Sequence, residues 1–313
     1  MSDPAPDPTG KRPAFGIVES VDDVTDIVLA AMAGAPNPRL SAVMAALVRH
    51  LHAFAREVRL TQDEYDIAID FLNRIGKETT DTHNEGILIA DELGLSSLVV
   101  LMNSGGKGPA EMQAALLGPF WRDHSPPTIN GSSIVRSPTP GPALFANCRI
   151  TDSDGRPIEG VQVDVWHASP VGLYENQDPN QADMNLRGRF RTDTEGRFWF
   201  RSVKPAGYPV PTHGPSGELL RAQRRHPYRP AHLHFLGYKP GYRTMITQVF
   251  VDDDPYLESD VVFGVTRDLI GQYVRRDAGE TLPATDVQAP WYTLDFSFNM
   301  ERGEAKRPIP PIK

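Results

Sequence analysis

Hydrophobic residues follow a helical period over the first third of the chain. Between residues 40 and 60 an apolar side chain recurs every three or four positions and forms one stripe: Val43, Leu47, Leu51, Phe54 and Val58. Similar spacing recurs over residues 24–34, 65–79 and 85–103, with a break near Gly94. Asp22 and Asp23 precede the first stretch as possible caps, and Thr61 and Glu64 have the spacing of a capping box. The pattern predicts a series of amphipathic helices.

The period changes to two from about Leu144 onward. Alternating runs occupy residues 143–152, 161–169, 196–203, 231–239 and 245–253, and turns rich in Gly, Pro and Asp separate them. Short strands at this spacing favour an antiparallel β-sandwich over a βαβ array. Proline usage supports the division, since residues 15–108 contain only Pro36 and Pro38.

These patterns predict a mainly β protein with an antiparallel sandwich domain and an N-terminal helical domain. We expect an N-terminal arm at 1–20, a helical domain at 21–110, and a sandwich domain with a C-terminal arm at 111–313. Residues 103–109 read as the connector. The helices are too few for a large core of their own. Their apolar stripes are therefore expected to pack on the second domain or on another subunit.

Composition and charge narrow the range of partners. The 313 residues carry a net charge of -8, which disfavours non-specific binding to nucleic acid because the protein would repel phosphates. Cys148 is the single cysteine, so the fold is held by its core and not by an internal disulfide. The N-terminus has no apolar run typical of a signal peptide, and no stretch reaches the ~18 apolar residues of a membrane span. The expected compartment is the cytoplasm.

The segment Arg229–Phe235 holds the most informative candidate residues. His232 and His234 are two positions apart in a predicted strand, so both imidazoles point to one face and can converge on an ion. Leu233 and Phe235 point to the opposite face, which suits a core. Two histidines in a strand are as often simply hydrogen-bonded, and an imidazole pair alone suits zinc, copper, nickel or iron.

Two loop tyrosines, Tyr174 and Tyr208, are candidate partners for this pair. A loop tyrosine more often lies at the surface or forms a tyrosine corner. A phenol has an ordinary pKa near ~10, so a phenolate ligand requires a strong Lewis acid and favours Fe(III) over Zn(II). Spacing alone does not establish this set. The run 252–254 of three aspartates could bind a divalent cation, although a structural strand end is the commoner role.

Several long segments together resemble the intradiol ring-cleaving dioxygenases. The matching segments are LLGPFWRDHSP, TDSDGRPIEGVQVDVWHASPVGLYENQD, LRGRFRTDTEGRFWFRSVKPAGYPVPTHGPSGELL, and RRHPYRPAHLHF followed by MITQVF. They occur in the family's order across residues 116–250, and the N-terminal helices also resemble the catechol-type members. The resemblance implies a catalytic β-sandwich, a dimer formed through the helices, and a possible phospholipid between them.

The resemblance also assigns roles to individual residues. It implies that Fe(3+) is held by Tyr174, Tyr208, His232 and His234, with Tyr208 and His234 axial. Arg229 and Gln248 are implied to lie beside the bound diol, and the Tyr208 phenolate to take a diol proton when it is displaced. The implied lining of the substrate pocket is Leu88, Asp91, Leu117, Gly118, Phe120, Val210 and Pro211.

The implied reaction is cleavage of an aromatic vicinal diol between its hydroxylated carbons. Both atoms of O₂ enter the product, and no external reductant is used. The LLGPFW segment and the pair Leu88 and Asp91 resemble the hydroxyquinol group, which implies that benzene-1,2,4-triol is converted to 3-hydroxymuconate or maleylacetate. Catechol or a substituted catechol is the alternative substrate. His213 and the Arg122–His124 segment depart from the expected pattern.

Two other functional classes are also compatible with parts of the sequence. The segment DGRPIEGVQVDVW resembles strand pairs of transthyretin-like sandwiches, which are binding or scaffold modules without catalysis. A zinc hydrolase built on the histidine pair is a third possibility, but no further histidine or carboxylate has suitable spacing.

Overall fold

The computed structural model describes residues 14–104 and 114–312. The predicted connector therefore lies mostly outside the described residues, as does most of the predicted N-terminal arm. The chain divides into two compact units, and the boundary in the sequence follows Phe71. In this division the helices that follow residue 78 belong with the sandwich. No helix in the described ranges is long and apolar enough to span a membrane.

The first unit contains α1 (Asp23–Met32), α2 (Pro38–Glu57) and the start of α3 (Gln62–Glu78). The predicted capping box is confirmed, because the Thr61 backbone N–H donates to Glu64 Oε2 at 2.9 Å and the Glu64 N–H donates to Thr61 Oγ1 at 3.3 Å. Asp22 makes no side-chain cap, whereas Asn37 caps α2 by accepting from the Leu40 N–H. The apolar stripe of α2 lies 42–57% exposed in the single chain.

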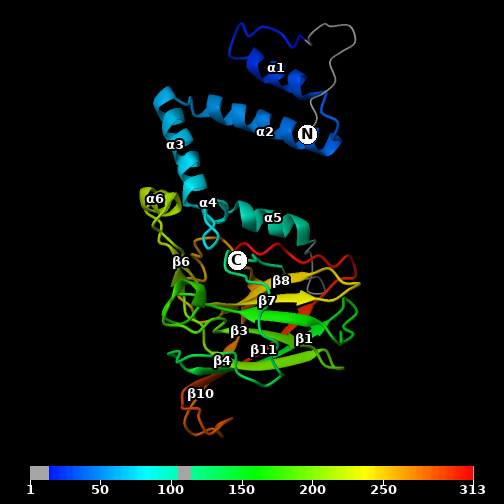
Figure 1. The fold of residues 1–313 in the computed structure, drawn as a ribbon, viewed down its shortest axis with the longest axis vertical. Coiled ribbons are helices and arrows are strands. Elements are labelled where there is room, and N and C mark those ends of the chain that lie inside the picture. The colour runs from blue at the N-terminus through cyan, green and yellow to red at the C-terminus, as the bar shows by residue number, and fades with distance from the viewer. Residues whose placement is uncertain (1–13, 105–113, 313) are drawn as a thin grey trace. The chain divides into compact units, whose positions relative to one another are not determined.

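The second unit is built on two stacked sheets (Figure 1). One sheet has the order β10-β11-β1-β4, from Tyr273–Arg276, Trp291–Asn299, Ala143–Thr151 and Arg197–Val203. The other has the order β3-β2-β7-β8-β9, from Arg187–Arg191, Gln162–Trp166, His232–Tyr238, Met245–Val251 and Ile270–Gly271. A short ladder joins β5 (Tyr208–Pro209) to β6 (Tyr228–Arg229), and three helices complete the unit: α4 (Glu85–Glu92), α5 (Leu95–Ser104) and α6 (Pro215–Ala222).

The five predicted strands are present, but the expected sheet class needs correction. β1 pairs in parallel with β11, and β8 pairs in parallel with β9, so both sheets are mixed. Neither pair is joined by a hairpin, so no tight turn forces the partners to run in opposite directions. The description as mainly β holds for the sandwich only, because helices cover more of the described residues than strands do.

Alternation along β7 separates the core from the polar face. Leu233 and Phe235 are fully buried in the cluster between the sheets, which also contains Phe190, Phe198, Phe200 and Phe298. His232 and His234 alternate with them and are also buried, at 2% and 1% exposure. The strand therefore has two covered faces, one apolar and one carrying the imidazoles.

Candidate metal centre

Four side chains from three parts of the second unit meet at one point. His232 and His234 lie on β7, and their Nε2 atoms are 3.0 Å apart. Tyr174 comes from the loop before the short helix η1 (Glu175–Gln177), and Tyr208 begins β5. The Tyr174 hydroxyl lies 3.0 Å from the Tyr208 hydroxyl and 3.0 Å from His234 Nε2. The structure thus brings the four residues implied as ligands together.

Burial sets the protonation of these groups. Desolvation lowers the pKa of both imidazoles well below the ordinary histidine value, so both are neutral near pH 7. Nδ1 of His232 donates to the Pro230 carbonyl at 2.7 Å, which leaves the Nε2 lone pair facing the site. Desolvation also raises the pKa of Tyr174 and Tyr208, so the phenols stay protonated unless a cation compensates.

The donor set fits a hard, highly charged transition-metal ion. Two imidazole nitrogens and two phenol oxygens suit iron better than an ion that prefers only oxygen or only sulfur ligands. The separations of 3.0 Å match ligands about 2.1 Å from one ion at roughly right angles. Among the described residues no group of three or more His, Cys, Asp or Glu side chains could hold a metal. A metal at this point therefore depends on the tyrosines.

Aromatic packing and one glycine hold the donors in place. Trp166 stacks on the His234 ring at 4.7 Å with an interplanar angle of 7°, and Phe120 stacks on Tyr174 at 4.5 Å. Gly118 has a φ of +74°, and a Cβ there would lie 3.2 Å from His234 Cε1. Only glycine combines that backbone conformation with so close an approach.

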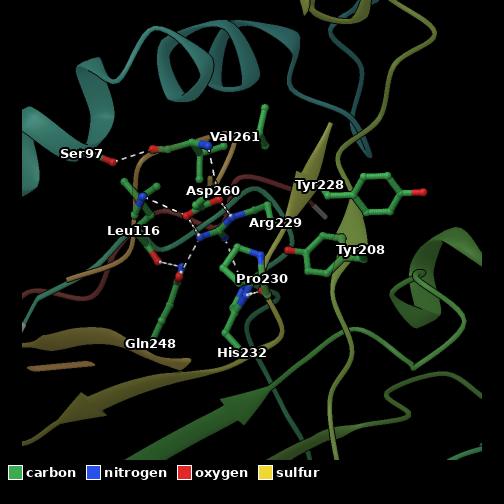
Figure 2. Close-up of polar contacts among 12 residues, drawn as sticks. Ser97, Leu116, Tyr208, Tyr228, Arg229, Pro230, His232, Gln248, Asp260 and Val261 are labelled. Atoms are coloured by element: carbon green, nitrogen blue, oxygen red, sulfur yellow. Dashed lines mark hydrogen bonds and ion pairs between the residues drawn. The ribbon is translucent and has the colours of Figure 1, made fainter. Parts of the chain in front are cut away.

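Arg229 connects the histidines to the remaining polar residues of the site (Figure 2). Its Nη1 donates to His232 Nε2 at 3.2 Å, and its Nη2 donates to Gln248 Oε1 at 3.0 Å. Gln248 in turn donates to the Leu116 carbonyl at 2.7 Å. Burial alone would lower the pKa of Arg229, but the interactions with Asp260, Tyr208 and Tyr174 together outweigh burial and the net shift is upward. The guanidinium is therefore a permanent cation beside the donors.

Most of the implied pocket residues lie in two buried clusters. Leu88 and Val210 pack together with Leu116, Val261 and Val262, whereas Leu117 and Phe120 pack with the two tyrosines. Asp91 is only 4% exposed, so this helix residue does not face solvent. Pro211 is half-buried, and its carbonyl contacts the Ser216 hydroxyl of α6. The structure thus gives no direct link between Pro211 and the four donors.

The residues that depart from the expected pattern lie outside the donor cluster. His213 is exposed and its ring packs at 4.8 Å from His83. Arg122 pairs with Glu175 and Asp183, both at 2.7 Å, and His124 is exposed. Glu175 follows Tyr174 directly and also accepts from Arg187 Nε, so these charges support the tyrosine loop.

The aspartate run at 252–254 has structural partners. Asp252 accepts from the Tyr273 N–H, Asp253 pairs with Lys204 at 2.8 Å, and Asp254 accepts from the Ala231 and Tyr256 N–H groups. The carboxylates therefore fix the end of β8 and the turn after it, as the commoner of the two interpretations predicted.

The sequence analysis did not identify the residues that pack against the metal-binding side chains and against Arg229. Asp260 contacts Arg229 through two carboxylate oxygens, Trp166 covers His234, and Arg187 lies 5.9 Å from the Tyr174 ring centre. The strand pairing places Trp166 between Arg187 and His234, so the register of three strands explains this row. The sequence did contain a sign of Trp166, because this residue ends the segment VQVDVW, which lies in a predicted strand.

Two family models together match most of the chain. Residues 117–301 match the family model described as Dioxygenase, and residues 37–108 match Catechol dioxygenase N terminus. The chain is 42% identical over 276 residues to 6-chlorohydroxyquinol 1,2-dioxygenase of Cupriavidus pinatubonensis, covering 88% of this chain and 95% of that protein. It is 37% identical over 278 residues to catechol 1,2-dioxygenase of Candida albicans, covering 88% and 91%. The solved structure of hydroxyquinol 1,2-dioxygenase from Pseudomonas putida DLL-E4 matches with a TM-score of 0.83 and 38% identity, covering 90% of this chain and 99% of that one.

Proposed function

Since the chain belongs to the intradiol ring-cleaving dioxygenase family, we propose that it cleaves hydroxyquinol (benzene-1,2,4-triol) with O₂. Membership of this family rules out the scaffold and zinc-hydrolase alternatives as accounts of the whole chain. The observation that carries the proposal is the convergence of two tyrosine hydroxyls and two imidazole nitrogens with 3.0 Å separations. Catechol is the second candidate substrate, favoured by the similarity to the Candida albicans enzyme.

Tyr174, Tyr208, His232 and His234 would hold Fe(3+) as its protein ligands. Bound there, ferric iron supplies Lewis acidity, which orients a chelating diol and polarises its ring towards reaction with O₂. The neutral imidazoles are ready to bind because their pKa is depressed by burial. The tyrosines must lose their protons, and the Tyr208 oxygen can then accept one proton of the incoming diol.

Arg229 and Gln248 would act on the reacting diol. The guanidinium is 4% exposed and stays protonated, so it stabilises negative charge that develops on the ring and its oxygens. Gln248 is held by Arg229 on one side and by the Leu116 carbonyl on the other. Its amide therefore has a fixed orientation before substrate arrives.

Asp91 and Leu88 would select the triol. Both are buried on α4, and Leu88 belongs to the same apolar cluster as Val210. An electrostatic interaction between Asp91 and Arg229 supports this role. A carboxylate there accepts a hydrogen bond from the third hydroxyl, and plain catechol would leave it without that partner.

The metal proposal is tested by spectroscopy on the purified protein. Tyrosinate bound to ferric iron should give a visible charge-transfer band and a wine-red colour, which should shift when benzenetriol is added without oxygen. Tyr174→Phe and Tyr208→Phe should each weaken the band, while Tyr228→Phe should leave it unchanged because that ring stacks on Tyr256 instead. A colourless protein with stoichiometric zinc would refute the proposal.

The N-terminal helices would form a homodimer. The stripe on α2 has the width and spacing of a helix-packing face, yet every member is at least 42% exposed in the single chain. The same apolar stripe would also hold a phospholipid between the helices of the dimer. Light scattering gives the mass in solution, and Leu47→Glu with Leu51→Glu should convert the dimer to a monomer. A wild-type protein of monomer mass would refute the dimer.

A further inference from the structure

We propose that Asp260 is a positioning residue that aims the Arg229 guanidinium at the candidate metal centre. This inference rests on the proposed function for its catalytic consequence, although the contact itself does not depend on it. Asp260 lies in the loop after β8 and is 5% exposed. No residue that the sequence resemblance singled out lies in this loop.

Asp260 binds the guanidinium along one edge. Its Oδ1 accepts from Arg229 Nε and its Oδ2 accepts from Arg229 Nη2, both at 3.2 Å. A two-point contact with a planar group fixes both the position and the plane of that group, which a single hydrogen bond does not do. Rotation of the Arg229 side chain about its last bonds would break both contacts together.

The contact with Asp260 determines where the remaining N–H groups of the Arg229 guanidinium point. With Nε and one Nη2 hydrogen used by Asp260, the second Nη2 hydrogen reaches Gln248 and Nη1 reaches His232 Nε2. Tyr208 lies beside Arg229 as its partner in the β5–β6 ladder. Figure 2 shows Asp260 on one side of the guanidinium and His232, Gln248 and Tyr208 on the other.

The Asp260 carboxylate is itself held by the loop it belongs to. It accepts from the backbone N–H groups of Val262 at 3.3 Å and Gly264 at 2.9 Å. The Ser97 hydroxyl of α5 donates to the Val262 carbonyl at 2.8 Å and so ties this turn to the helix. A Cβ at Gly264 would lie 3.0 Å from Arg229 Nη2, which explains the glycine. The orientation of the Arg229 guanidinium thus depends on a series of contacts that begins with Ser97 of α5.

The negative charge of Asp260 also compensates the positive charge of Arg229. Arg229 and Asp260 are both buried, and removing one partner leaves the other charge uncompensated. Without Asp260, the guanidinium would lose both of the contacts that fix its position and plane. The expected consequence is a displaced cation, with the iron ligands untouched.

The activity test uses Asp260→Asn, which keeps the shape and removes the charge. Hydrogen bonds to charged groups are strong enough for kcat on benzenetriol, expressed per bound iron, to fall roughly 10- to 100-fold. KM should change little, because Arg229 acts on charge that develops during the reaction. Glu258→Gln is the matched control, since this exposed carboxylate two positions away should leave both constants unchanged.

The same substitution in an Arg229→Leu background separates positioning from a general structural role. If Asp260 acts through Arg229, Asp260→Asn should add less than a threefold further loss there. An equal fold-loss in both backgrounds, or a change confined to KM, would overturn the proposal.

Thermal melting of the metal-free protein tests the contact without any activity. Each single variant should melt below wild type, and the double variant should melt above Arg229→Leu because the orphaned carboxylate is gone. Additive losses would refute the coupling. If wild type turned over no diol but the melting temperatures were coupled, the proposed function would fail while the Asp260–Arg229 contact stood.

Discussion

The choice of the triol over catechol depends on Asp91, and Asp91→Ala isolates that dependence. The carboxyl is 4% exposed and makes a hydrogen bond with Ser96, so water does not compensate for a lost partner. A hydrogen bond from a neutral hydroxyl to a buried carboxylate contributes about 1.5–3 kcal/mol, which corresponds to a factor of about 10–150 in kcat/KM. Catechol has no third hydroxyl, so its kcat/KM should change less than about threefold.

The assay is oxygen uptake with benzenetriol and with catechol on the same preparation. Glu92→Gln is the matched control, because it removes the next buried carboxyl of α4, which interacts with Ser216, Arg225, Glu85 and Asp91 but not with Arg229. The ratio of the two kcat/KM values should fall in Asp91→Ala and stay constant in the control. Equal losses on both substrates would show that Asp91 only supports the helix and that the reasoning on specificity is wrong.

The pH dependence adds an independent check on Asp91. Burial, with a smaller contribution from Asp260, raises the pKa of Asp91 to about 6. Below that pH the carboxyl is protonated and is a poor acceptor for the third hydroxyl. The triol preference should therefore increase as the pH rises from 5 to 7 and should be independent of pH in Asp91→Asn. A preference that stays flat in the wild type would contradict the assignment.

Three further predictions concern stability and metal binding. Burial raises the pKa of Glu92 to about 7, so its contribution to stability is full below about pH 4.5 and is lost as the pH rises through 7. Glu92→Gln should therefore raise Tm at pH 8, through a gain of at most about 3 kcal/mol in the free energy of unfolding, and should hardly change Tm at pH 5. Gly118→Ala should reduce iron content measured by elemental analysis, because its methyl group displaces the His234 ring; full iron occupancy would contradict this. Removing iron with a chelator should lower Tm, and adding it back should restore Tm, because the ion binds the folded state only; an unchanged Tm would argue against the site.

Local patterns in the sequence predict local structure well. The period of two in residues 231–239 predicts that His232 and His234 share a face opposite Leu233 and Phe235, and the strand has this arrangement. The Thr61 capping box needs only four consecutive residues and is also present. In both cases the contact that matters lies within one element, so no information about distant residues is required.

Contacts between distant segments are not encoded in any period. Tyr174 contacts His234 across 60 positions, and in the sequence only the family resemblance links the two residues. Strand β3 was not predicted because two of its three arginines pair with carboxylates: the buried Arg187 with Glu175 and the partly buried Arg189 with Asp164. Hydrophobic periodicity does not detect a strand whose buried side chains are charged. β11 does alternate over its second half, but its partner β1 lies almost 150 residues earlier.

Charge compensation explains why so many polar groups lie within one buried site. The two imidazoles are neutral because burial lowers their pKa, and the phenols are neutral because burial raises theirs. Arg229 is the one group among these that keeps its charge, and Asp260 balances it on the side away from the donors. Fe(3+) held by this set would require the phenols to lose their protons, and the phenolates would then supply the negative charge that balances the ion.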